Sequence, residues 1–203
     1  LSMVHHIGKL SNAFQFKIME RLPQVQTIVA PLTLTKPETT EHAWSHHTLV
    51  GAGILHELGA RDWVVSIVGA HHGSIMDQPD FDAIMKAERN LYGKAEDRPL
   101  WQSLWRECLE EALAQAGYAS VDELPEKMSI PAQMLLIALT VTADWLSSNT
   151  AFFPLLDESN LQNENETYPA RIDRALKKMD FSERWLPGDA WQYQDLCYDR
   201  FGF

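Results

Sequence analysis

The chain has 203 residues and a net charge of −11, from 28 acidic and 17 basic residues. Hydrophobic residues make up 45% and charged residues 22%, which is typical of a globular protein and excludes wholesale disorder. The acidic balance also excludes a general basic surface for nucleic acid, so any contact with phosphate must be local or mediated by a metal. The length favours one domain, which we expect to span residues 1–203.

Cysteine content and apolar runs narrow the class of protein further. The two cysteines, Cys108 and Cys197, exclude a disulfide scaffold and a cysteine-rich zinc site, and they favour a reducing cytoplasm. No apolar run approaches the roughly 20 residues of a membrane span, so no membrane partner is expected. Residues 1–7 are too short, and have no basic start, for a signal peptide.

Hydrophobic periodicity along the chain predicts an all-α protein. Residues 1–7 are typical of the last turns of a buried helix that ends at Gly8, and residues 77–80 predict a turn. The Pro/Thr-rich stretch 25–39 and the Asn-rich stretch 155–168 predict loops. In chain order, the predicted helices span residues 10–21, 41–58, 63–71, 82–92, 100–116, 131–148 and 170–179.

Three of these predicted helices carry a polar residue on the apolar face. His47 falls on the inner face of the helix over 41–58, and His71 falls on the inner face of the next helix. Asp144 shares the predicted inner face of the helix over 131–148 with Met134, Ile137 and Val141. A carboxylate on such a face is unfavourable unless it is paired or bound to a metal.

The distribution of histidine is the strongest functional indication in the sequence. All eight histidines lie before residue 73. Imidazole suits transition metals, and helical bundles build metal sites from inward side chains on facing helices. A single histidine is more often an ordinary core or surface residue, and His42 and His56 are interpreted in this way. Together with Asp144, three adjacent pairs predict a metal site in the bundle core: His5–His6, His46–His47 and His71–His72.

Several common catalytic motifs are absent. The His56-Glu57 pair would need a second histidine at position 60 to form a zinc-protease motif, and that residue is Ala60. The sequence has no glycine-rich phosphate loop, no dinucleotide-binding fingerprint and no GxSxG elbow. Cys108 lies among charged residues without a local signature for a nucleophile.

Four segments together resemble the motifs of HD-family nucleases in order and in connecting length. The set is similar to the HD nuclease domain of the signature nuclease–helicase of type I CRISPR systems, over residues 1 to about 156 and in the final YDRFGF, which resembles the lead into the helicase part. The segments are HHIGKLSNAFQFK at 5–17, SHHTLVGAGIL at 45–55, VGAHHGSI at 68–75 and ADWLSSNTAFFP at 143–154.

The resemblance implies an HD-domain helical bundle that cuts single-stranded DNA with two transition metals. It also implies partners, namely the helicase part of the same protein and an RNA-guided surveillance complex, in a prokaryotic cytoplasm. Lys9 would lie near the scissile phosphate. The implied ligands are His5 and Asp144 for the first ion, and His47, His71 and His72 for the second.

Two departures from the family pattern bear on activity. The family's first metal-binding histidine lies upstream of the HD pair, where this chain has not yet begun, and the bridging aspartate is replaced by His6. A carboxylate can hold two ions, whereas a neutral imidazole offers one lone pair. We therefore expect the first ion to be weakly bound or absent. Three or four imidazoles would hold the second ion and favour nickel, cobalt, iron, manganese or zinc over magnesium.

Three hypotheses about function follow. The first is a metal-dependent single-stranded DNA endonuclease domain that is impaired by His6. The second is an HD phosphohydrolase that acts on nucleotides, and the third is a non-catalytic binding module that keeps the HD fold. Two segments favour the nuclease over the phosphohydrolase. They are the Phe14-Gln15 pair, which follows Gly8-Lys9, and the sequence ADWLSSN at 143–149.

Overall fold

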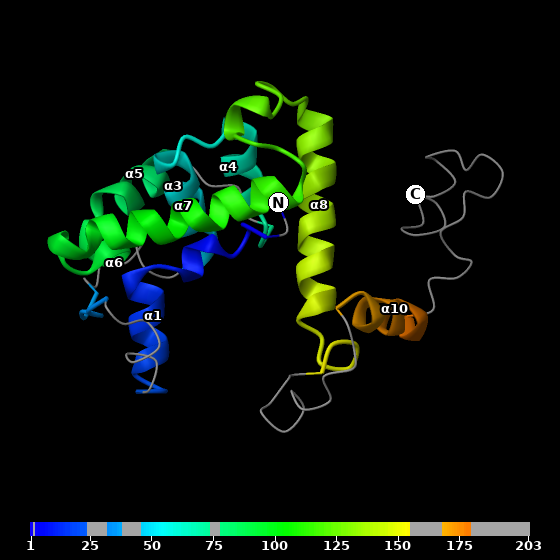
Figure 1. Ribbon diagram of the computed structural model, residues 1–203, viewed down its shortest axis with the longest axis horizontal. Helices are drawn as coiled ribbons and strands as arrows, with labels where there is room; N and C mark the ends of the chain where they lie inside the picture. Colours follow the sequence, from blue (N-terminus) through cyan, green and yellow to red (C-terminus); the bar gives the residue numbers. More distant parts are fainter. Residues whose placement is uncertain (2, 24–31, 38–45, 74–77, 155–167, 180–203) are drawn as a thin grey trace, which may run out of the picture. The chain divides into compact units, whose positions relative to one another are not determined.

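The computed structural model describes residues 1, 3–23, 32–37, 46–73, 78–154 and 168–179. All regular elements in these ranges are helices, which confirms the all-α prediction (Figure 1). The elements are η1 (Ile7–Lys9), α1 (Asn12–Met19), α3 (His47–Glu57), α4 (Asp62–Gly69), α5 (Gln78–Lys86), α6 (Glu88–Tyr92), η2 (Ala95–Asp97), α7 (Arg98–Gln115), η3 (Val121–Glu123), α8 (Ile130–Ser147) and α10 (Tyr168–Met179).

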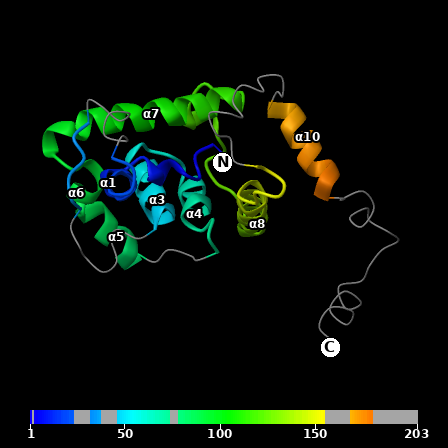
Figure 2. The ribbon, with the colours of Figure 1, turned by 90° about the horizontal axis from the view of Figure 1, so that it is seen from below.

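The chain divides into two compact units, Leu1–Ala143 and Asp144–Phe203. In the first unit, α3 packs against η1, α4 and α5, and α1 packs against α6 (Figure 1). Helix α7 lies along one side of the group formed by α1, α3 and α4 (Figure 2). Two buried tryptophans fix α7 there, because Trp101 Nε1 donates to Tyr92 O and Trp105 Nε1 donates to Leu10 O.

The second unit contains the end of α8, the turn over 148–154 and α10. In the turn, Ala151 N donates to Asn149 Oδ1 over 2.9 Å. Lys178 Nζ in turn donates to Ala151 O over 2.7 Å, and the side chain of Arg171 donates to Pro154 O, so α10 is anchored to the turn by two basic side chains.

The strongest periodic patterns predicted their helices well. The prediction of helices over 41–58 and 63–71 agrees with α3 and α4, although residues 41–45 lie outside the described residues. Gly59 and Gly73 follow these helices with φ of 76° and 85°, the left-handed conformation that glycine adopts at helix ends. The predicted tail of residues 188–203 also lies outside the described residues.

Three local predictions were wrong. Residues 3–6 form turns and lead into the 3-10 helix η1, with hydrogen bonds such as Ile7 N to Val4 O at 3.0 Å, because so short a segment cannot sustain an α-helix. The predicted turn at 77–80 is instead the start of α5 from Gln78 onward. Pro79 is compatible with this, since proline is well tolerated in the first helical turn. The predicted helix over 82–92 is divided at Ala87 between α5 and α6.

Helix α8 agrees with the expectation only in part. Ile137 of the predicted inner face packs against the core, and Leu136 does so as well, whereas Met134 is 54% exposed. Among the described helices, α8 alone is long and apolar enough to cross a membrane, with a mean hydropathy of 1.3 over 18 residues. Length and composition are weak evidence for a span, because helices of other kinds of protein meet the same criteria.

A buried asparagine connects three separate segments of the first unit. Asn12 is fully buried, its Oδ1 accepts a hydrogen bond from Thr35 N at 2.8 Å, and its Nδ2 donates to Thr35 O and Arg89 O at 2.9 Å each. A Cβ on Gly93 would lie 2.7 Å from Asn12 Oδ1, so only glycine fits beside this side chain. The extended segment 32–37 is therefore tied to both α1 and α6.

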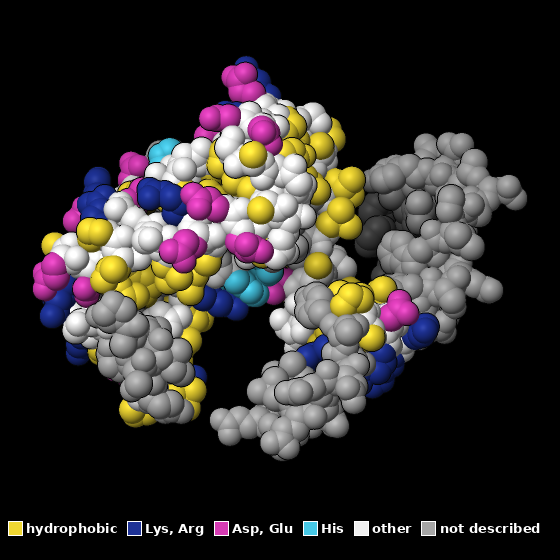
Figure 3. Space-filling model, in the orientation of Figure 1, with side chains coloured by type: hydrophobic (Ala, Val, Ile, Leu, Met, Phe, Trp, Pro, Cys, Tyr) yellow, Lys and Arg dark blue, Asp and Glu magenta, His cyan; other side chains and the backbone are white. Residues whose placement is uncertain are grey.

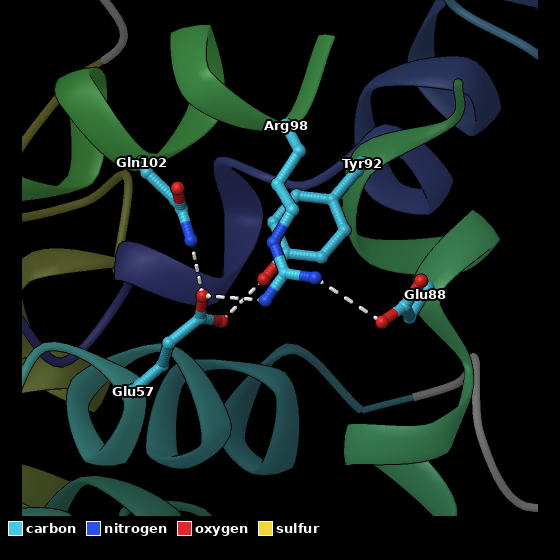
Figure 4. Close-up of polar contacts among 5 residues, drawn as sticks. All are labelled: Glu57, Glu88, Tyr92, Arg98 and Gln102. Carbon is cyan, nitrogen blue, oxygen red and sulfur yellow. Dashed lines mark hydrogen bonds and ion pairs between the residues drawn. The ribbon is translucent and has the colours of Figure 1, made fainter. Parts of the chain in front are cut away.

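A carboxylate at the end of α3 connects that helix to α6 and α7 (Figure 4). The Glu57 carboxylate accepts hydrogen bonds from Tyr92 Oη and Gln102 Nε2, and it forms an ion pair with Arg98 at 3.3 Å. Arg98 also lies over the Tyr92 ring, 4.8 Å from its centroid. Burial, reinforced by the hydrogen bond to Glu57, raises the pKa of Tyr92 well above its usual value, so the phenol stays protonated and donates.

Replacement of Glu57 should destabilise the fold. We expect Glu57→Ala to lower the free energy of unfolding by about 1.5–3 kcal/mol, because it removes the charged acceptor of several hydrogen bonds. Urea denaturation measures this loss. The matched control is Glu88→Ala, whose side chain is 65% exposed and pairs with the same Arg98, so its cost should stay below about 1 kcal/mol. Equal losses in the two variants would contradict a special role for Glu57.

Candidate metal centre

Helix connectivity brings the histidine pairs to one end of the first unit. His47 is the first residue of α3, and His71 and His72 directly follow α4. The short connection between α3 and α4 makes the two helices neighbours, so the start of α3 lies beside the end of α4. His5 and His6 immediately precede η1, which packs against α3.

The contact between η1 and α3 depends on a glycine. A Cβ on Gly8 would lie 1.9 Å from His47 O and 2.5 Å from Gly51 N, distances that no real side-chain carbon occupies. The backbone of η1 therefore rests directly on the first turn of α3. This close approach sets the distance between the His5–His6 pair and His47.

Five of the predicted ligands lie together in the first unit. The ring centroids of His6 and His47 are 5.1 Å apart, and those of His71 and His72 are 4.6 Å apart. His5 adjoins the same group, with its ring centroid 5.1 Å from that of His71. The strongest candidate ligand set is a group of four imidazoles whose ligand nitrogens all lie within 4.8 Å of one another: His6, His47, His71 and His72.

The burial of these rings decreases from the core to the surface. His71 is fully buried, His6 and His47 are intermediate, and His72 is exposed. Figure 3 shows histidine side chains that reach the surface close to basic side chains. The group therefore lies at the edge of the core, where an ion could enter from solvent.

Two ring nitrogens are arranged as a metal ligand requires. The Nδ1 of His71 lies 2.6 Å from Val68 O, and because a carbonyl accepts, this nitrogen carries the proton and Nε2 carries the lone pair. The Nε2 of His47 is buried and has no hydrogen-bond partner among the described residues. A buried polar nitrogen without a partner is unfavourable unless something binds it, so the donor set fits a cation.

Burial and neighbouring charge keep His47 neutral. The pKa of His47 is lowered from 6.5 to about 3, mainly by loss of hydration and also by the nearby Lys9 and the surrounding imidazoles. At neutral pH the ring therefore offers its lone pair. Lys9, the last residue of η1, is close enough to act on this ring electrostatically, and it is the basic side chain that the sequence assigned to the site.

His46, His56 and His42 are not members of this group of four. His46 precedes α3 at its N-cap position, and His56 packs its ring against Phe81 at 5.0 Å, as expected of an ordinary residue. His42 lies outside the described residues. Asp144 is on α8 and belongs to the second unit, so its role as a ligand stays a prediction from the sequence.

Comparison with known proteins identifies the family to which the chain belongs. A family model described as "Cas3, HD domain" matches residues 1–153. The chain belongs to the Cas3 HD-domain family. The resemblance found in the sequence is thereby confirmed, and the histidine group lies within the part that the Cas3 HD-domain model covers.

A curated relative gives the scale of the match. The CRISPR-associated nuclease/helicase Cas3 of Streptococcus thermophilus is 31% identical over 223 residues, and the match covers 100% of this chain but 23% of that protein. The chain thus spans about a quarter of the relative's length. No solved structure matches the chain.

The packing of Gly8 on α3 should control metal binding. We expect Gly8→Ala to push η1 away from His47 and to weaken zinc binding at least tenfold, measured by calorimetric titration. Gly51→Ala places a Cβ 3.2 Å from Gly8 N and should cause a smaller loss. Gly53→Ala on the same helix is the matched control, because its Cβ would meet side chains of α5 and not η1, namely Met85 at 3.0 Å and Ile84 at 3.4 Å. Equal zinc affinity for Gly8→Ala and Gly53→Ala would contradict the positioning role.

Protonation of His47 should make the metal-free protein less stable in acid. Because the folded pKa of about 3 lies below the unfolded value of 6.5, the unfolded chain binds more protons between these values. The stabilising contribution is thus complete above pH 6.5 and is lost as the pH falls toward 3. Urea denaturation from pH 7.5 to 5 should show this loss. In His47→Gln, the free energy of unfolding should vary less with pH than in the parent. His56→Gln is the control for loss of an imidazole and should keep the parent's pH dependence. If His47→Gln also keeps it, the pKa shift does not belong to His47.

Proposed function

We propose that the chain is the metal-dependent, single-stranded DNA nuclease domain of a type I CRISPR nuclease–helicase, with activity weakened by His6. The observation that carries this proposal is the convergence of four imidazoles within the region that the Cas3 HD-domain model matches. Family membership supports hydrolysis of a phosphodiester bond. The imidazole donors support a transition metal as the cofactor.

The proposed ligands divide into two sets. His47, His71 and His72 would hold one ion, nickel, cobalt, iron, manganese or zinc, with His6 able to join them. His5 and Asp144 would hold a second ion only weakly, because no bridging carboxylate stands at position 6. A divalent ion bound at such a site lowers the pKa of coordinated water and stabilises charge on the phosphoryl group.

The residues around the ligands would orient the DNA. Lys9 is proposed to pair with the phosphate at the cleavage position, because its ammonium group stands at the end of η1 beside the histidine group. The net charge of −11 makes this local cation important, since the rest of the surface is on average repulsive to DNA. We expect DNA binding to weaken steeply with salt.

The proposed partners follow from the family. The helicase part of the same protein and an RNA-guided surveillance complex would deliver the single strand, in the cytoplasm of a prokaryote. The match covers 23% of a relative that is named a nuclease/helicase, which supports a helicase part elsewhere in the full protein. A delivered strand reduces the need for a basic surface on the nuclease domain itself.

Restoration of the acidic residue should raise activity. We expect His6→Asp to cleave a labelled single-stranded oligonucleotide at least tenfold faster than the parent with nickel, cobalt or manganese, equivalent to about 1.4 kcal/mol of transition-state stabilisation. The matched control, His56→Asp, makes the same chemical change outside the histidine group and should behave as the parent does. If no metal supports cleavage by His6→Asp, the nuclease proposal is wrong; hydrolysis of a nucleotide panel instead would favour the phosphohydrolase.

A further inference from the structure

The histidine group contains one more imidazole than an open catalytic site needs. Catalytic zinc sites use three protein ligands and leave a fourth position for water, whereas structural sites are closed by four. The group of His6, His47, His71 and His72 supplies four imidazole donors and no carboxylate. Each imidazole contributes one lone pair, so four rings can complete a tetrahedron around one ion.

We propose that these four imidazoles form a closed site that holds a single ion as a structural cross-link, with no coordination position left for water or a phosphodiester. The proposal rests on the metal binding proposed above and deepens it. His6 is the closing ligand, because the other three match the ligands that the family resemblance implies. Water or a phosphodiester could then reach the ion only when His6 dissociates from it, so this closed site would weaken cleavage in addition to the loss of a bridging carboxylate.

The distances agree with closure around one ion. With metal–nitrogen bonds of about 2.0–2.1 Å, the nitrogens of a tetrahedron lie about 3.4 Å apart. The ligand nitrogens of the group lie within 4.8 Å of one another, so modest rotation of the side chains suffices. His71 is already oriented by its hydrogen bond to Val68 O, and His47 has a buried Nε2 without a partner among the described residues.

The backbone holds the closing ligand in place. His6 lies two residues before Gly8, whose backbone rests on the first turn of α3, so its ring is 5.1 Å from the ring of His47. The same ring is 5.5 Å from that of His71. One ion would therefore join the segment before η1, the start of α3 and the end of α4, which are far apart in sequence. Such a cross-link acts on stability rather than on substrate.

Cobalt(II) is a direct probe of this coordination, because four-coordinate cobalt absorbs visible light strongly and six-coordinate cobalt absorbs it weakly. The metal-free full chain is titrated with cobalt(II), and then azide is added. We expect one equivalent to bind with intense visible bands, no spectral change with azide, and a melting temperature that rises with cobalt concentration. His6→Ala should bind cobalt at least tenfold more weakly and should respond to azide, while His56→Ala should match the parent.

Each outcome decides between the two proposals. Weak visible bands, a second bound equivalent or an azide response in the parent would overturn the closed site and leave the proposed metal centre intact. An unchanged spectrum in His6→Ala, with the fold verified by circular dichroism, would also overturn it, because His6 would then not be a ligand. If neither cobalt, zinc nor nickel binds, the proposed metal-dependent function fails as well.

Discussion

The histidine group depends on one contact, the direct packing of the η1 backbone on the first turn of α3. Gly8 has no side chain, and the space a Cβ would need is filled by His47 O and Gly51 N. Without this approach, the turn that carries His6 would lie farther from the ring of His47. The surrounding apolar core, including the fully buried Ile54, Leu55 and Ile67, gives this contact a rigid base, because close-packed interiors yield little to displacement.

The sequence predicted which histidines come together, but not the backbone contact that positions them. Helical periodicity placed His47 and His71 on inner faces, and both rings lie in the group. Glycine, however, has two roles that the sequence does not distinguish. Gly59 and Gly73 end helices with positive φ, whereas Gly8 was interpreted as a helix end and instead provides space for a neighbouring backbone. That role depends on a contact between distant segments, which local pattern cannot reveal.

Other differences have similarly tertiary causes. The residues around Ala87 do not predict an interruption of the helix. The backbone nevertheless turns there with ψ of 55°, and α6 packs against α1. Met134 and Ile137 belong to the same predicted stripe of α8, and only the extent of the packing on the core decides that Ile137 is covered while Met134 is exposed. The Glu57 network was missed entirely, because its partners come from α6 and α7. Periodicity thus predicts that a face is buried, but not against which neighbour.

Helix α3 is anchored at both ends by different chemistry. At its far end Glu57 is bonded to groups from two other helices, and at its near end η1 is packed on the first turn. The start of α3 is therefore held in place by contacts that need no ion. Folding already places the backbone segments that carry the imidazoles, so ion binding would require only rotation of the side chains. Selectivity among ions would then reflect the nitrogen donors and how closely the rings can approach one another.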